Sequence, residues 1–197
     1  WNSSLKDKPK YEFKDTFFKS KELYNLLKSF YTYGFIIIEN VPITKNYIIK
    51  FANSIGNIRQ TNFGKYFNVK SVPKPNDLAY TSHALSPHTD NPYRKPVPCI
   101  QLLHCIENEV SGGLSTLVDG FKVANYLKEH NPDYFTILTK VKVKFKFIDK
   151  NIVLENEGTL IELDENSNLK QIRFSTRLDY TPILNKDELE LYYKARK

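Results

Sequence analysis

Residues 86–94 read SPHTDNPYR, and within them His88 and Asp90 are separated by a single residue. Side chains alternate along an extended chain, so residues two positions apart project from the same side of it. An imidazole and a carboxylate in this arrangement can therefore face one metal ion. Two histidines and one carboxylate, with coordination positions left open, form the facial triad of non-haem Fe(II) sites. The spacing predicts two of the three ligands of such a site.

A histidine and an aspartate at this spacing are a weak signal alone, and the residues that follow strengthen it. Residues 99–106 (CIQLLHCI) form an apolar run that predicts a strand. Gly112 and Gly113 predict a turn, and residues 114–118 predict a second strand. The motif thus comes between a loop rich in proline and aromatic residues and the first strands of a sheet, a common position for binding residues.

The N-terminal part predicts a helix, a strand and a second helix. Apolar residues recur at helical spacing from a cap at Ser20 as far as Gly34. Residues 35–39 (FIIIE) predict a buried strand, and another helix is expected from a cap at Thr44 as far as Gly56.

The C-terminal part predicts strands with helices inserted. Residues 141–148 (VKVKFKFI) alternate strictly, as in an antiparallel strand with one face in water. Residues 159–163 and 169–174 flank a polar turn and predict a hairpin. Helices are expected at residues 121–127, after Asn131 and Pro132, and from a capping pair formed by Asn185 and Glu188.

This order of elements predicts an α+β fold whose strands form a double-sheet jelly roll. We expect a single domain over residues 1–197. Residues 1–60 would be its helix and strand portion, and residues 61–197 its jelly-roll portion.

The composition excludes several classes of protein. The formal net charge is +7, but the lysines are scattered, which favours a solvated surface over a nucleic-acid site. Cys99 and Cys105 form no disulfide framework, so a cytoplasmic, reducing setting is expected. We expect no membrane partner, because no run of about 18 apolar residues occurs. The absence of methionine leads us to expect a trimmed or incomplete chain.

Three stretches resemble the TauD/TfdA family of dioxygenases, especially its gamma-butyrobetaine dioxygenase branch. They are residues 76–98 (NDLAYTSHALSPHTDNPYRKPVP), 100–105 (IQLLHC) and 111–121 (SGGLSTLVDGF). Weaker similarity extends from residues 35–42 (FIIIENVP) to residues 172–177 (IRFSTR) and the last helix. The resemblance implies a cupin-like double-stranded β-helix with flanking helices, here incomplete at its C-terminal end.

The same resemblance implies Fe(II), 2-oxoglutarate and O₂, and the hydroxylation of a small molecule with release of succinate and CO₂. The implied substrate is gamma-butyrobetaine or a related trimethylammonium or amino-acid-like compound. His88 and Asp90 match the first two iron ligands. Ser115 matches a hydroxyl that holds the 2-oxoglutarate tail, and Leu103 matches an apolar residue lining that site. A homodimer is implied as well.

Aromatic residues at Phe63, Phe67 and Tyr80 match the positions of a cage for a trimethylammonium group, which binds the faces of aromatic rings. The alternative is that these rings only pack the core or a loop. Asp77 and Asn91 are further candidates for substrate binding. Asp77 stands where the animal gamma-butyrobetaine dioxygenases have an asparagine, and Ser175 with Thr176 stands where they have an Asn-Asn pair. These differences leave the identity of the substrate undecided.

The family's third ligand, a distal histidine, and the arginine that pairs with 2-oxoglutarate belong to a C-terminal segment like DNxRxLHGR. This sequence contains no such segment, so it should bind iron poorly. His83, His104 and His130 are expected to be structural or exposed rather than substitutes.

Two other readings stay open. One is a catalytically silent jelly-roll binding module, and the other is a hydroxylase of nucleic acid or protein. A family member with a different small substrate is a further alternative.

Overall fold

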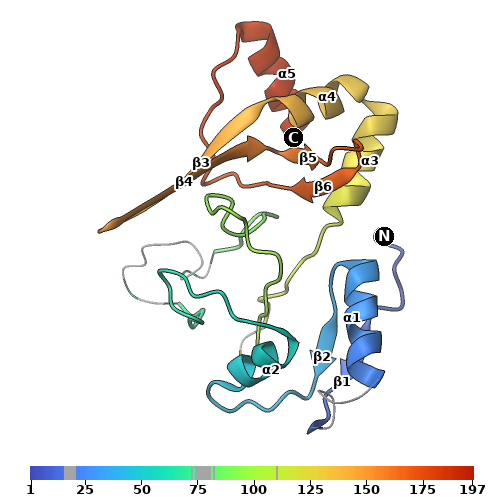
Figure 1. Ribbon diagram of the computed structural model, residues 1–197, viewed down its shortest axis with the longest axis vertical. Coiled ribbons are helices and arrows are strands. Elements are labelled where there is room, and N and C mark those ends of the chain that lie inside the picture. The colour runs from blue at the N-terminus through green and yellow to red at the C-terminus, as the bar shows by residue number, and fades with distance from the viewer. Residues whose placement is uncertain (16–20, 72, 74–80, 82, 110) are drawn as a thin grey trace. The chain divides into compact units, whose positions relative to one another are not determined.

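The computed structural model describes residues 1–15, 21–71, 73, 81, 83–109 and 111–197 (Figure 1). These residues divide into two compact units. The first is Trp1–Ala84 together with Gln101–Leu114, and the second is Leu85–Ile100 together with Ser115–Lys197. Helices and short sheets are both present, so the chain has the predicted α+β character.

The first unit begins with a small parallel sheet. Strand β1 (Lys10–Glu12) pairs with β2 (Ile37–Glu39), and helix α1 (Lys21–Tyr33) lies between them in the chain. Helix α1 ends where predicted. Gly34 has a φ of 76°, and its N–H donates to the oxygen of Phe30 at 2.8 Å. A glycine adopts this left-handed conformation without steric cost, which suits it to end a helix. The predicted cap, Ser20, lies outside the described residues.

The second predicted helix is also present, as α2 (Tyr47–Ile55). The predicted cap at Thr44 is wrong: the N-cap is Asn46, whose side chain makes no capping hydrogen bond. The backbone oxygen of Thr44 instead accepts from the N–H of Tyr47 at 3.1 Å, just before the helix. Gly56 donates its N–H to the oxygen of Ala52 at 3.0 Å and closes the last turn.

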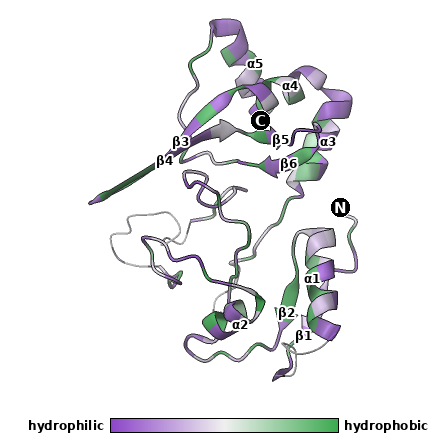
Figure 2. Cartoon of the chain, viewed as in Figure 1, coloured by the Kyte–Doolittle hydropathy of each residue, from purple (hydrophilic) through white to green (hydrophobic). Residues whose placement is uncertain are grey.

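The second unit contains two antiparallel hairpins. Strands β3 (Lys142–Asp149) and β4 (Ile152–Thr159) form the longer one, and β5 (Ile161–Leu163) with β6 (Leu169–Ile172) forms the shorter one. Val143 and Phe145 on β3 are fully buried, whereas Lys142 and Lys144, which alternate with them, are exposed. Hydrophilic and hydrophobic residues alternate visibly along β3 in Figure 2. The half-solvated strand predicted from the alternating pattern is therefore confirmed.

Three helices complete this unit: α3 (Gly120–His130), α4 (Pro132–Lys140) and α5 (Lys186–Arg196). Pro132 opens α4 as predicted, and the predicted capping box of Asn185 and Glu188 opens α5. The helices bury their apolar faces together with β3 and β5, and this burial is what stabilises the unit. The core consists of Tyr93, Ala124, Ile137, Leu138, Val143, Phe145, Leu160, Ile161, Tyr192 and Ala195. No helix in the described part of the chain is long and apolar enough to span a membrane.

Two strand predictions are wrong. Residues 99–106 and 114–118 form no strand, because none of their described residues has a ladder partner. Their apolar side chains stay exposed, and Leu103 and Leu114 retain 72% and 91% of their accessible surface. An apolar run indicates which side chains favour burial, but a strand also needs a neighbour to bind its backbone groups. The described strands make three two-stranded sheets, so closure of a jelly roll stays a prediction.

Residues 173–180, which we call the connecting segment, join several parts of the second unit. The N–H of Arg173 donates to the oxygen of Leu160 at 2.8 Å. Further along, the N–H of Lys146 on β3 donates to Leu178, and the N–H of Tyr180 donates back to Lys144, both at 2.8 Å. The connecting segment is thus held against the free edge of β3 through backbone hydrogen bonds.

Candidate metal site

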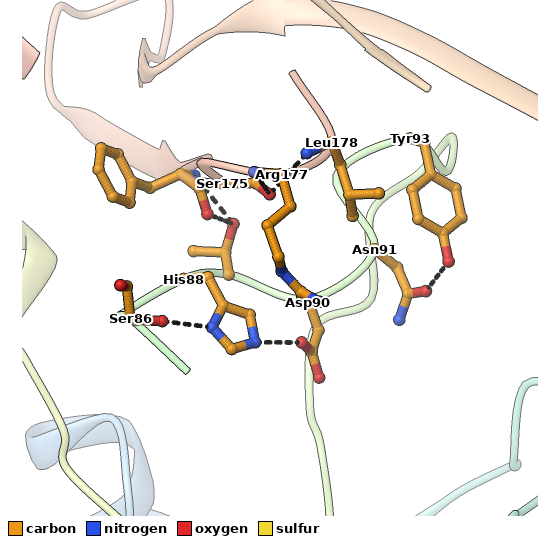
Figure 3. Close-up of polar contacts among 10 residues, drawn as sticks. Ser86, His88, Asp90, Asn91, Tyr93, Ser175, Arg177 and Leu178 are labelled. Carbon is orange, nitrogen blue, oxygen red and sulfur yellow. Dashed lines mark hydrogen bonds and ion pairs between the residues drawn. The ribbon is translucent and has the colours of Figure 1, made fainter. Parts of the chain in front are cut away.

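His88 and Asp90 lie in the second unit, and their side chains face each other. The Nε2 atom of His88 is 3.3 Å from Oδ1 of Asp90. Figure 3 shows both side chains projecting from the same side of the chain, as the spacing predicts. Neither is fully covered, since His88 keeps 25% of its side-chain surface exposed and Asp90 keeps 37%. The pair is therefore accessible to a small ion or molecule from solvent.

The hydrogen bonding of His88 determines its tautomer. Its Nδ1 atom lies 2.7 Å from the backbone oxygen of Ser86. A carbonyl oxygen can only accept, so Nδ1 must carry the hydrogen and donate it. In a neutral ring the remaining nitrogen, Nε2, then has a free lone pair, and this is the atom that faces Asp90. A ligating histidine is usually held in this way, with the second nitrogen bound to a carbonyl or carboxylate.

The two facing atoms fit a bound cation. A ring-nitrogen lone pair and a carboxylate oxygen are both acceptors, so they need a proton or a positive ion between them. Neighbouring ligands on an octahedral ion with bonds of about 2.1 Å lie roughly 3 Å apart. The observed separation of 3.3 Å is close to that value. Imidazole nitrogen and carboxylate oxygen are also the donor types of the facial triad.

The residue between the two candidate ligands binds the connecting segment. The backbone N–H of Thr89 donates to the oxygen of Phe174 at 2.7 Å. In return, the N–H of Phe174 donates to Oγ1 of Thr89 at 3.0 Å. Thr89 projects to the side opposite His88 and Asp90, because neighbours alternate along an extended chain. The connecting segment therefore binds the motif through Thr89, while the side chains of His88 and Asp90 project together from the chain (Figure 3).

The connecting segment is itself braced by buried polar groups. The Ser175 hydroxyl is nearly inaccessible and accepts hydrogen bonds from the N–H groups of Arg177 at 3.3 Å and Leu178 at 3.2 Å. Asp179 forms an ion pair with Arg196 of α5. Burial raises the pKa of Asp179 above its ordinary value, and the positive charge of Arg196 partly opposes that rise.

The residues after the motif are held by strand β4. The side-chain amide of Asn156 donates to the backbone oxygens of Pro92 at 3.3 Å and Arg94 at 2.9 Å. Asn91 adopts a left-handed backbone conformation with a φ of 51°, and the Tyr93 hydroxyl donates to its Oδ1. The chain thus turns sharply directly after Asp90. Asn91 is next to the candidate ligands, and its predicted role in substrate binding stays a prediction.

Sequence reasoning missed three of these supporting residues: Thr89, Asn156 and Phe174. Alternation alone could have assigned Thr89 to the opposite side of the motif. No sequence signal identifies Asn156 or Phe174, which lie more than 60 residues further along the chain.

Among the other predicted site residues, Ser115 belongs to the second unit and Leu103 to the first. Both are exposed, and their predicted contacts with 2-oxoglutarate stay predictions. Phe63 and Phe67 belong to the first unit, and their ring centroids are 5.5 Å apart at a tilt of 46°. Two of the three predicted cage rings thus contact each other. Asp77 and Tyr80 lie outside the described residues.

Two other described histidines, His130 and His104, behave differently from His88. His130 is exposed, stacks on Tyr126 and donates from Nδ1 to the Tyr126 oxygen at 3.0 Å. His104 has a buried Nε2 for which the described residues supply no hydrogen-bond partner. Within the described ranges, no three side chains of His, Cys, Asp or Glu gather as a potential metal site. Among the described residues, His88 and Asp90 therefore form a pair of candidate ligands without a third.

Comparison with known proteins gives this site its context. The chain is 38% identical over 154 residues to the mitochondrial trimethyllysine dioxygenase of Bos taurus, covering 76% of this chain and 36% of the relative. It is 33% identical over 162 residues to the gamma-butyrobetaine dioxygenase of Pseudomonas sp., covering 82% and 42% respectively. Against the human gamma-butyrobetaine dioxygenase, identity is 32% over 178 residues, covering 89% and 46%.

The chain therefore spans between about a third and a half of the length of these relatives. A family profile described as taurine catabolism dioxygenase TauD, TfdA family, matches residues 9–195, which is nearly the entire chain. The resemblance first noted around His88 and Asp90 extends across both units, and the chain belongs to the TauD/TfdA family of dioxygenases.

Proposed function

We propose that this protein is a non-haem dioxygenase that uses Fe(II), 2-oxoglutarate and O₂ to hydroxylate a small trimethylammonium compound. Gamma-butyrobetaine and trimethyllysine, which the relatives are named for, define the substrate class. The observation that carries the proposal is the 3.3 Å approach of His88 Nε2 to Asp90 Oδ1. It occurs with the histidine in the ligating tautomer and in a chain of this family.

His88 and Asp90 would hold the iron from one side, leaving its other positions for a third ligand and the co-substrates. Bound iron with 2-oxoglutarate supplies the oxidising chemistry, in which the oxoacid becomes succinate and CO₂ while the substrate gains a hydroxyl. The protein's task is to hold and orient these groups. Ser115 would donate to the oxoacid tail, and Leu103 would exclude water beside it. Among the described residues, no third His, Cys, Asp or Glu side chain gathers with this pair.

Recognition of the proposed substrate would depend on local rather than overall charge. A formal charge of +7 repels a cationic substrate at long range. Recognition of a quaternary ammonium therefore has to come from nearby ring faces and carboxylates, and a cation over a ring face gains about 0.5–2 kcal/mol. Phe63 and Phe67, already in contact, are the described members of the proposed cage. Tyr80 would complete it, while Asp77 and Asn91 would contact the polar end of the substrate.

The same proposal includes the compartment, the fold and the partners of the protein. The exposed free thiols of Cys99 and Cys105 favour a reducing compartment such as the cytoplasm. The α+β chain would form part of a cupin-like jelly roll. Small molecules, rather than nucleic acid or membranes, would be its partners, and the family suggests a homodimer.

A second candidate function is a catalytically silent binding module of the same family. The observation that favours it is the incomplete ligand set in the described residues. Such a module would bind a trimethylammonium compound without consuming 2-oxoglutarate. The two functions therefore differ in whether the oxoacid is turned over.

The deciding experiment measures succinate release by the whole protein with Fe(II), ascorbate and 2-oxoglutarate. It compares gamma-butyrobetaine, trimethyllysine and taurine, and uses unmethylated lysine and gamma-aminobutyrate as matched controls. We expect succinate release to rise at least about tenfold with a trimethylammonium compound and to remain at background with its unmethylated counterpart. Binding of these compounds without succinate release would instead identify the silent module. Stimulation by taurine alone would refute the proposed substrate class.

A further inference from the structure

Thr89 makes three hydrogen bonds to a single residue on the connecting segment. Its backbone N–H donates to the Phe174 oxygen at 2.7 Å, and its hydroxyl lies 3.3 Å from the same oxygen. The hydroxyl oxygen also accepts from the Phe174 N–H at 3.0 Å. The Thr89 hydroxyl thus accepts a hydrogen bond from the backbone N–H of Phe174, while the hydrogen of the hydroxyl can point to the Phe174 carbonyl oxygen. This closed pattern links two segments that are 85 residues apart in sequence.

This link holds the residue that lies between the two candidate ligands. Thr89 occupies the face of the motif opposite His88 and Asp90, so a rotation of its backbone would turn both ligands away together. A single backbone hydrogen bond leaves such a rotation possible. A second bond through the hydroxyl fixes two points on one residue and so opposes it.

The part of the connecting segment that Thr89 binds is held in place by other contacts. Arg173, directly before Phe174, donates its N–H to Leu160 at 2.8 Å. Ser175, directly after Phe174, is 2% exposed, and its backbone oxygen accepts a hydrogen bond from Nη2 of Arg196 at 2.8 Å. Phe174 is therefore held on both sides by contacts that do not involve the motif. The Thr89 hydroxyl connects the motif to this fixed point.

We propose that the Thr89 hydroxyl is a positioning group for the metal site, which keeps His88 Nε2 and Asp90 Oδ1 directed at one ion. This inference rests on the proposed function, since it assumes that the two residues bind a metal. Thr89 itself would not contact metal, oxoacid or substrate. Groups that orient ligands from behind the ligating residues usually change metal affinity by about 10- to 100-fold when removed.

Two substitutions separate the hydroxyl from the rest of the side chain. Thr89→Val keeps the branched shape and the preference for an extended chain, but it removes the hydroxyl and leaves the Phe174 N–H without its acceptor. Thr89→Ser keeps the hydroxyl and removes the methyl group. Thr159→Val is a matched control, because the Thr159 hydroxyl donates to the Ile161 oxygen at 2.8 Å in a different part of the same unit.

The measurement is the dissociation constant of the whole protein for Co(II), a spectroscopic substitute for Fe(II), followed by its visible absorption. We expect Thr89→Val to weaken binding at least about tenfold and to change the absorption spectrum. Thr89→Ser should stay within about twofold of the wild type, and so should Thr159→Val, even if it lowers the free energy of unfolding. Catalytic turnover is not needed for this comparison.

The outcomes are distinguishable. Equal affinity and spectrum for Thr89→Val and wild type would overturn the positioning role while leaving the proposed metal site intact. An equal loss in Thr89→Ser and Thr89→Val would assign the effect to the methyl group and overturn it too. A wild-type protein that binds no Co(II) would remove both proposals together.

A measurement on the wild type covers the case in which Thr89→Val does not fold. Metal binding should slow hydrogen exchange at the Phe174 amide at least about tenfold, because an ordered motif keeps the Thr89 hydroxyl in place. Amides on α4, such as that of Leu138, serve as the internal reference. Unchanged exchange at Phe174 at saturating metal would contradict the proposal.

Discussion

Arg196, on the last helix, donates from Nη2 to the backbone oxygen of Ser175 at 2.8 Å and pairs with the carboxylate of Asp179. Its guanidinium also lies 5.7 Å from the ring centroid of Phe174. One side chain thus ties α5 to three residues of the connecting segment. Because that segment also binds Thr89, the last helix contributes to the support of the candidate metal site.

This relationship predicts a large effect of removing Arg196. Its side chain and that of Asp179 are 15% and 5% exposed, so Arg196→Met leaves a buried carboxylate without its partner. Breaking such a pair costs about 3 kcal/mol or more. Urea unfolding should show this loss in the single variant, and the double variant Arg196→Met, Asp179→Leu should recover much of it. A single variant that loses under about 1 kcal/mol would contradict the assigned role of the ion pair.

Tyr192 should tolerate loss of its hydroxyl. The side chain is fully buried in the core, and the described residues supply no hydrogen-bond partner for its oxygen. Burial raises the pKa of Tyr192 to about 12, so the group stays protonated over the ordinary pH range. Tyr192→Phe should leave the free energy of unfolding unchanged or raise it by up to about 1 kcal/mol. Tyr192→Ala should lower it by roughly 3–5 kcal/mol by opening a cavity.

The contacts of Glu162 predict that part of the folding stability is lost in acid. Its carboxylate contacts Lys170 Nζ at 2.8 Å and Arg173 Nη2 at 2.6 Å, and these two cations lower the pKa of Glu162 from its ordinary value of 4.5. A pKa lowered on folding stabilises the protein above the unfolded-state value, and that contribution is lost as the pH falls below about 4.5. The wild type should therefore exceed Glu162→Gln in urea midpoint at pH 7, and the difference should shrink toward pH 3.

Glu190 provides the control for that experiment. It pairs with Lys194 at 2.6 Å, and the pair is largely exposed on α5. Exposed pairs contribute little to stability. Glu190→Gln should therefore show only a small difference from the wild type at either pH. A pH-independent difference for Glu162→Gln would show that its contacts act through packing rather than charge.

Gly158, on β4, predicts a steric limit. A Cβ atom added there would lie 2.7 Å from Nη1 of Arg173, and the guanidinium is held by Glu162. Gly158→Ala should therefore cost about 1–3 kcal/mol in unfolding free energy. Pairing it with Arg173→Ala should make the alanine tolerable. If Gly158→Ala costs as much in the Arg173→Ala background as in the wild type, the predicted clash is wrong.

His88→Ala should remove iron-dependent succinate formation with a change in unfolding free energy below about 1 kcal/mol. The side chain is partly exposed, and its hydrogen-bond partner is a backbone oxygen that water can satisfy. The matched comparison is His130→Ala, which removes an exposed histidine on α3 and should keep wild-type turnover. Wild-type turnover in His88→Ala would refute its assignment as a ligand.

Much of the local structure could be predicted from the sequence. Helix ends at Gly34 and Gly56, the capping pair at Asn185 and the alternation along β3 all depend on residues a few positions apart. The shared direction of His88 and Asp90 belongs to the same class, since it needs only an extended backbone. These features depend on steric and hydrogen-bonding preferences within one segment.

Which segments far apart in the sequence become neighbours was decided by the tertiary structure alone. The apolar run at residues 99–106 gave a wrong strand prediction, since side-chain pattern does not reveal whether another backbone is available to pair with it. Likewise, the contacts of Thr89 with Phe174, and of Asn156 with Arg94, join residues more than 60 positions apart. Such pairs form only when the collapse of the core brings distant segments together. The sequence alone therefore specified that the side chains of His88 and Asp90 lie on the same side of the chain, and the folded chain decided which residues hold them there.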